Sequence, residues 1–158
     1  MKKIIGLVAS IVVLITLSAC GNEKTKTFVG KKDNVKVEVT YTYKGDRIIK
    51  QKSVSTLKYS DFGISDDTSK KRVKEAIERQ SEKMQDVKGV KDSTKENDEG
   101  FVETLDVDFE KADIDTLKSK GIVNIAGNKG TSISMKKTEK KMKEIGFKEK
   151  EDLSLIHI

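Results

Sequence analysis

Four consecutive residues near the N-terminus have the types and order that covalent lipid attachment needs. Leu17, Ser18 and Ala19 precede Cys20, the single cysteine of the chain. This order is the bacterial lipobox pattern: a lipid-transferring enzyme alkylates the thiol, and a peptidase that accepts only small side chains then cuts before it. The motif predicts a diacylglycerol, with or without a further N-acyl chain, on Cys20, and two or more chains are what stable anchoring takes.

The residues before Cys20 have the pattern of an export signal. Met1-Lys2-Lys3 is cationic, and the apolar run Ile4–Leu17 is about fourteen residues long, whereas a membrane-spanning helix needs roughly 20. We therefore expect a signal peptide over residues 1–19, a lipidated cysteine with a short linker over residues 20–26, and a location at the cell membrane on its extracytoplasmic face. The linker reaches only about 20 Å when extended.

The composition excludes several classes of chemistry. With one Cys and one His, the chain holds neither an internal disulfide nor a Cys/His metal cage, and His157 lies too near the end to serve a Ser-His-Asp site. Catalysis by carboxylates alone would need an acid in an apolar pocket paired with one in a polar setting, and no such pair is evident. We expect no enzyme, no metal and no cofactor, and export excludes nucleic acid as a partner.

Alternating residues predict a β-hairpin early in the mature chain. Valines and tyrosines alternate with polar residues over 34–43, Lys44-Gly45-Asp46 supplies a turn, and residues 47–58 form the partner strand. Tyr41 and Tyr43 share the apolar face of their strand, which indicates core packing rather than base stacking.

The middle of the chain predicts a helix and a third strand. Asp66, Asp67, Thr68 and Ser69 are acidic or capping residues ahead of apolar residues at helical spacing, which continue for about four turns before Gly89. Residues 91–100 contain no apolar side chain and are interpreted as a polar connection. Apolar and polar residues alternate again over 101–109, which predicts the third strand.

The last third predicts two helices around short strands. Residues 112–120 form a short helix that stops at Gly121, and strand candidates over 122–126 and 131–135 flank a turn over 127–130. Residues 136–145 form the last helix, closed by Gly146 and Phe147. The result is a single α+β domain over 27–152, with an antiparallel sheet of about four to five strands and two main helices plus one short helix packed on it. Residues 153–158 are a tail of doubtful origin.

Three motifs resemble the YehR-like family of small bacterial lipoproteins. They are the lipobox, the run Val-Asp-Phe-Glu-Lys-Ala-Asp at 107–113 leading to Gly121, and the run Ser-Ile-Ser-Met-Lys-Lys-Thr-Glu at 132–139 leading to Gly146. The resemblance covers the mature chain except its last six residues. It implies a lipid-anchored extracytoplasmic α+β domain and brings no catalytic residues.

Acidic side chains on the third predicted strand are one candidate site. Asp106, Asp108 and Glu110 fall on the face opposite the apolar residues, about 6.6 Å apart at roughly 3.3 Å per residue. Carboxylates in a row suit a hard cation such as calcium, but a straight strand spreads them. The alternative is a solvated sheet face with Lys50 and Lys52 as cross-strand partners.

A lysine-rich helix is the other candidate site. Its lysines are Lys136, Lys137, Lys140, Lys141 and Lys143. They form either a patch against anionic lipid or wall polymer or the ordinary wet face of an amphipathic helix. The favoured function is a membrane-anchored, non-catalytic binding or accessory module with an unknown protein or envelope ligand. The alternative is an envelope-structural protein lying on anionic lipid or wall polymer through this helix.

Overall fold

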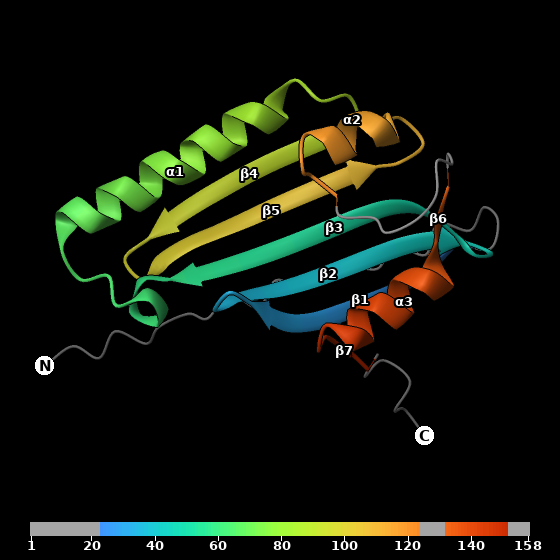
Figure 1. Ribbon diagram of the computed structural model, residues 1–158, viewed down its shortest axis with the longest axis horizontal. Helices are drawn as coiled ribbons and strands as arrows, with labels where there is room; N and C mark the ends of the chain where they lie inside the picture. The colour runs from blue at the N-terminus through green and yellow to red at the C-terminus, as the bar shows by residue number, and fades with distance from the viewer. Residues whose placement is uncertain (1–22, 124–131, 152–158) are drawn as a thin grey trace, which may run out of the picture.

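The computed structural model describes residues 23–123 and 132–151 (Figure 1). In chain order its elements are β1 (Glu23–Lys32), β2 (Val35–Lys44), β3 (Arg47–Lys58), the 3-10 turn η1 (Tyr59–Phe62), α1 (Asp67–Gln85), β4 (Val90–Asn97), β5 (Gly100–Asp108), α2 (Ile114–Ser119), β6 (Ile133–Ser134), α3 (Met135–Glu144) and β7 (Lys148–Glu149).

All strands join one antiparallel sheet. The order is β4-β5-β3-β2-β1-β7, and β6 pairs with β3 beside this path. Tight turns set the register: Asp33 and Asn34 between β1 and β2 both have positive φ, 49° and 66°, as a type I′ hairpin turn requires. The predicted α+β class with an antiparallel sheet is confirmed, and over the described residues the sheet has seven strands rather than the expected four to five.

The elements with clear periodicity are confirmed within one or two residues at most ends. The hairpin of β2 and β3, the strand β5 and the helices α1, α2 and α3 occur where the pattern predicts them. Asp66 caps α1 by accepting a hydrogen bond from the Ser69 amide at 2.8 Å, which satisfies one of the free amides of the first turn. Phe147 is buried after Gly146 ends α3 with a φ of 87°.

Two regions differ from the prediction. Residues 91–100 are not a polar connection, because β4 occupies Val90–Asn97 and pairs with β5 over its whole length. β1 begins at Glu23, within the segment 20–26 that composition assigns to the linker, and pairs with β2 throughout. β4 is an edge strand, and β1 has only the two-residue strand β7 on its other side. Few residues of either strand are apolar, so cross-strand backbone hydrogen bonds form them rather than a hydrophobic pattern.

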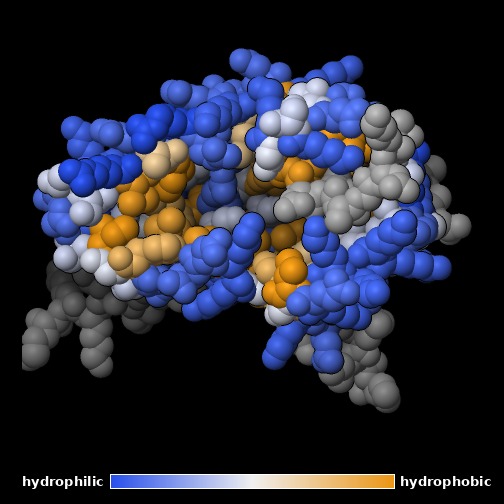
Figure 2. Space-filling view, in the orientation of Figure 1, coloured by the Kyte–Doolittle hydropathy of each residue, from blue (hydrophilic) through white to orange (hydrophobic). Residues whose placement is uncertain are grey.

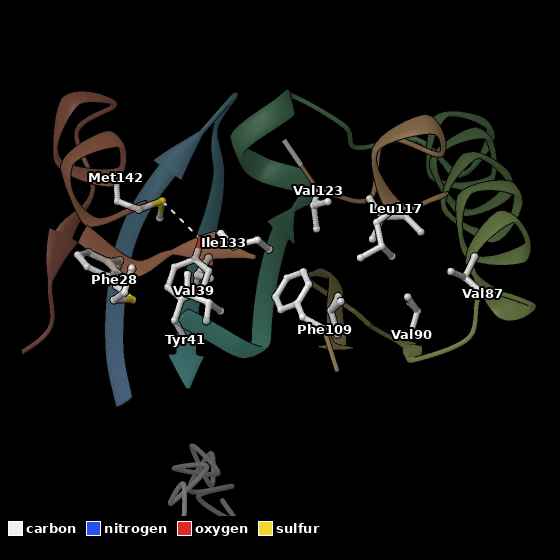
Figure 3. Packing of buried hydrophobic residues seen from close by; sticks show 14 of the residues in the cluster. Phe28, Val39, Tyr41, Val87, Val90, Phe109, Leu117, Val123, Ile133 and Met142 are labelled. Atoms are coloured by element: carbon white, nitrogen blue, oxygen red, sulfur yellow. Dashed lines mark hydrogen bonds between the residues drawn. The ribbon is translucent and has the colours of Figure 1, made fainter. Parts of the chain in front are cut away.

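The hydrophobic core lies on one face of the sheet, which we call the inner face; the opposite face is the open face. Figure 3 shows side chains from β1, β2 and β4 pointing toward those of α2 and α3 on the inner side. The predicted packing of the tyrosines is confirmed: Tyr41 is buried and donates a hydrogen bond to Met142 Sδ at 3.9 Å, and Tyr43 packs against the same cluster.

The segment after α2 is only partly described. Ile122 and Val123 are buried but belong to no strand, and Ile133–Ser134 form the two-residue strand β6. The remainder of the predicted strands and the turn over 127–130 fall in residues 124–131, which lie outside the described residues. The tail 153–158 lies outside them as well.

Candidate functional site

The lipobox Leu17-Ser18-Ala19-Cys20 lies outside the described residues, but the structure describes the strand that follows it. Cys20 is three residues before Glu23, the first residue of β1, so at most about 11 Å separates their Cα atoms. Glu23 pairs with Lys44 beside the β2–β3 turn. A lipid on Cys20 would therefore hold this end of the sheet next to the bilayer.

The same end of the sheet holds the start of α3. Asp46, in the β2–β3 turn, accepts hydrogen bonds from the Lys136 amide at 2.8 Å and the Ser134 hydroxyl at 2.7 Å. These two hydrogen bonds, that of the Lys136 amide first, hold the pKa of Asp46 below its ordinary value. The helix is thus attached to the hairpin turn through one carboxylate.

The five candidate lysines lie on α3, as predicted, but acidic side chains lie among them. Lys143 is 2.6 Å from Glu139, and Lys140 is 3.8 Å from Glu144. Glu139 also pairs with Lys26 of β1 at 2.7 Å. This helix therefore presents a partly neutralised surface, which weakens the argument for a patch that binds anionic polymers.

The three candidate acids do not converge. Asp106 and Asp108 lie on the open face of β5, whereas Glu110 lies beyond the end of the strand. The expected partners are in register: Lys52 pairs with Asp106 and Lys50 with Asp108. Within residues 23–123 and 132–151, no group of three acidic, His or Cys side chains could hold a metal ion.

Asp108 has a stronger local partner than the cross-strand lysine. Its carboxylate lies 2.9 Å from Lys111 Nζ. Partial burial acts to raise the pKa of Asp108, but hydrogen bonds from the Lys111 side chain and the Glu110 amide outweigh it and hold the pKa below its usual range. Among the described residues, this part of the open face therefore holds one ion pair, between Asp108 and Lys111.

The centre of the inner face is hollow. β3 is an interior strand, yet it directs small polar side chains toward the side on which the helices lie. We define the recess floor as the six neighbouring inner-face residues of β2, β3 and β5: Val37, Gln51, Ser53, Ser55, Glu103 and Leu105. All six are half-buried and none is fully buried. Solvent therefore reaches the middle of a face whose two sides are covered.

Helices at the two sides of the sheet form the walls. α1 packs along β4, where the Ser81 hydroxyl donates to Asp92 and Lys74 lies 2.9 Å from Glu96. On the other side, Phe147 follows α3 and lies against Gly30 of β1. Figure 2 shows the surface hollowed between α1 and α3, with polar side chains between two apolar areas.

Glu103 is the charged residue of the floor. Burial, and after it the negative charge of Asp92 on the neighbouring strand, raise the pKa of Glu103 above its usual value. Asp92 Oδ1 and Thr94 Oγ1 are buried, and neither has a hydrogen-bond partner among the described residues. None of these three residues is among the candidate site residues predicted from the sequence. The signal was available for Glu103, because it occupies an inward position in the alternation of Phe101, Leu105 and Val107.

Among the helices that the structure describes, none is long and apolar enough to cross a membrane. The chain is 36% identical to the uncharacterized lipoprotein Lin0239 of Listeria innocua over 152 residues, which covers 96% of this chain and 97% of the relative. It is 30% identical to the uncharacterized lipoprotein YehR of Escherichia coli over 150 residues, covering 94% and 96%. These relatives indicate a lipid-anchored location.

Solved structures agree with the fold. The NMR structure of Escherichia coli YehR matches with a TM-score of 0.70 at 27% identity, over 87% of this chain and 99% of that one. A Streptococcus pneumoniae protein solved by NMR has a TM-score of 0.58 at 18% identity, over 95% and 98%, and shares the fold.

A family model described as protein of unknown function (DUF1307) matches residues 24–148. This range runs from the second residue of β1 to the first residue of β7, so it contains both walls and the floor of the recess. The resemblance to the YehR-like lipoproteins is confirmed, and the chain belongs to this family.

Proposed function

We propose that this protein is a lipid-anchored, non-catalytic binding module on the extracytoplasmic face of the membrane. In this proposal Cys20 is the lipidated residue and the recess between α1 and α3 is the binding site. The lipobox at 17–20 and the lipoprotein relatives support the anchor. Mass spectrometry of the purified protein should find a thioether-linked diacylglycerol on an N-terminal Cys20.

One observation carries the binding role: Ser53 and Ser55 are half-exposed in the centre of the inner face. An inner-face position of an interior strand normally holds a large apolar side chain, because a covering helix excludes water there. Two serines at successive inner positions of β3 instead leave space and hydrogen-bonding groups. A concave surface with apolar sides and a few polar groups is what ligand sites have in common.

The chemistry of the floor supports binding rather than catalysis. A serine nucleophile needs a neighbouring base that accepts its proton. The side-chain partner of Ser53 is Gln51, whose amide donates a hydrogen bond to Ser53 Oγ at 3.0 Å, and an amide is not a base. Ser55 is opposite the carboxylate of Glu103, but no hydrogen bond joins these two described side chains. The floor therefore offers hydrogen bonds and one carboxylate.

The short connection to the anchor supports a role near the bilayer. Ser53 is level with Val39 and Phe28, five residues along β1 from Glu23, which is roughly 17 Å at 3.3 to 3.4 Å per residue. With the β2–β3 turn at the membrane, the recess would stand just beyond the lipid headgroups and open to the side.

Site-specific photo-cross-linking in intact cells tests the recess. A photoreactive phenylalanine analogue replaces Ser55 of the floor or, as the matched control, Thr104 on the open face of the neighbouring strand β5. We expect a cross-linked product from position 55 and none from position 104. Equal products from both positions, or none from position 55 in protein that reaches the membrane, would contradict the proposal.

A further inference from the structure

Glu103 is a charged residue at a position that otherwise takes apolar side chains. The other inner-face residues of β5 are Phe101, Leu105 and Val107. Glu103 lies between Ser55 on β3 and Thr94 on β4, half-buried in the recess floor. A carboxylate taken partly out of water is costly unless a partner compensates its charge.

Cations among the described residues do not compensate this charge. The ion pairs of the inner face include those of Lys26 with Glu139 and Glu149 and that of Lys74 with Glu96, and the described ion pairs include none with Glu103 or Asp92. Asp92 is diagonal to Glu103 across β4 and β5, so two negative charges lie on one side of the recess. Asp92 Oδ1 and Thr94 Oγ1, which lie beside Glu103, are buried and also lack a hydrogen-bond partner among the described residues. This side of the recess is electrostatically suited to a positively charged group.

The shape of the recess favours an extended occupant. Its floor runs across three adjacent strands and stays half-exposed, so it does not enclose a small molecule as a deep pocket would. Ser53, Ser55 and Gln51 can exchange hydrogen bonds with peptide groups. Val37 and Leu105 offer apolar contact on either side of the serines.

We propose that the recess binds an extended peptide segment that carries a Lys or Arg side chain, with its cation paired to Glu103. This inference rests on the proposed binding function and adds the class of ligand. The serines and Gln51 bind the peptide groups, the apolar floor residues contact the neighbouring side chains, and Glu103 selects for positive charge. Binding of the cation also lowers the pKa of Glu103 from its raised value, since an opposite charge favours the ionised carboxylate.

Calorimetric titration with two matched peptides tests the proposal. The lipoprotein is reconstituted in phosphatidylcholine nanodiscs, whose zwitterionic lipid avoids unspecific cation binding, and empty nanodiscs serve as the blank. The probes are the capped pentapeptide Ser-Leu-Lys-Leu-Ser and the same peptide with norleucine in place of lysine. We expect the lysine peptide to bind about tenfold more tightly, the difference that a charge-assisted hydrogen bond provides.

Two single-residue variants test whether Glu103 causes the preference for the lysine peptide. Glu103→Gln should remove the preference for lysine, whereas Asp106→Asn, which removes a carboxylate from the open face of the same strand, should leave it unchanged. Equal binding of both peptides to the unmodified protein would overturn the charge selection and leave the recess itself supported. Binding of neither peptide would overturn the peptide inference, and cross-linking at position 55 would then decide separately whether the recess binds another ligand.

Discussion

The contact between Gly30 and Phe147 holds one wall of the recess on the sheet, and it predicts the effect of adding a single methyl group. A Cβ atom at Gly30 would lie 2.7 Å from Cγ and Cδ2 of the Phe147 ring and 2.9 Å from Cδ1. Carbon atoms in favourable contact are about 3.5 to 4.0 Å apart. Gly30→Ala therefore requires the ring to move away by about 1 Å.

The surroundings of Phe147 oppose this movement. Its side chain is only 6% exposed and belongs to the core cluster, and its amide donates a hydrogen bond to the Met142 carbonyl at 2.9 Å. Overpacking a core in this way costs about 1 to 3 kcal/mol. We expect Gly30→Ala to lower the free energy of unfolding by this amount, measured as a lower urea midpoint at an unchanged slope.

A double-mutant cycle separates this clash from other effects of the substitution. Phe147→Leu shortens the side chain that blocks the new methyl group, so it should restore part of the stability lost in Gly30→Ala. Gly45→Ala is the control: nothing lies within 4 Å of its added Cβ, and its cost arises from a φ of +60°. Phe147→Leu should not relieve that cost. A Gly30→Ala protein as stable as the parent, or additive effects in the cycle, would refute the packing argument.

Two further predictions concern ionisable groups. Burial raises the pKa of Tyr41 to about 12, above its unfolded value of about 10. The stability that the neutral phenol contributes is therefore complete below about pH 10 and is lost as the pH rises toward 12. Absorbance titration should show a late phenolate step that Tyr41→Phe removes. The pKa of Asp46 is lowered chiefly by the Lys136 amide, so its contribution is present above the unfolded value and is lost as the pH falls through the folded one. Asp46→Ala should speed hydrogen exchange of the Lys136 amide, whereas Asp98→Ala in the β4–β5 turn should not; equal exchange rates would contradict the assignment.

Local sequence patterns were sufficient to predict the strands in which apolar and polar residues alternate and the helices in which apolar residues repeat with the helical period. In β2 the apolar residues Val35 to Tyr43 occur at every second position, so one face of the strand has to be buried wherever the strand is placed. Asp66 ahead of α1 and Gly146 after α3 likewise act within a single turn of the chain. Such signals need no knowledge of distant residues.

The strands β1 and β4 had no such local signal. β4 contains one apolar residue, Val90, and β1 begins with exposed polar residues. Each is a strand because a neighbouring strand supplies backbone partners, and for β4 because α1 covers one side of it. Asp106 and Asp108 lie on one strand face as predicted, but the assignment of Glu110 to that face is wrong, because it lies past the end of the strand, so the three carboxylates do not meet.

The amino-acid sequence by itself determined the predicted membrane anchor and the types of the main elements, because a lipobox and a hydrophobic period act between residues that are close along the chain. Only the tertiary structure decided that Ser53, Ser55 and Glu103 lie in one recess. Cross-strand register brings these residues together, and the positions of α1 and α3 leave them uncovered. Both depend on contacts between residues that are far apart in the sequence.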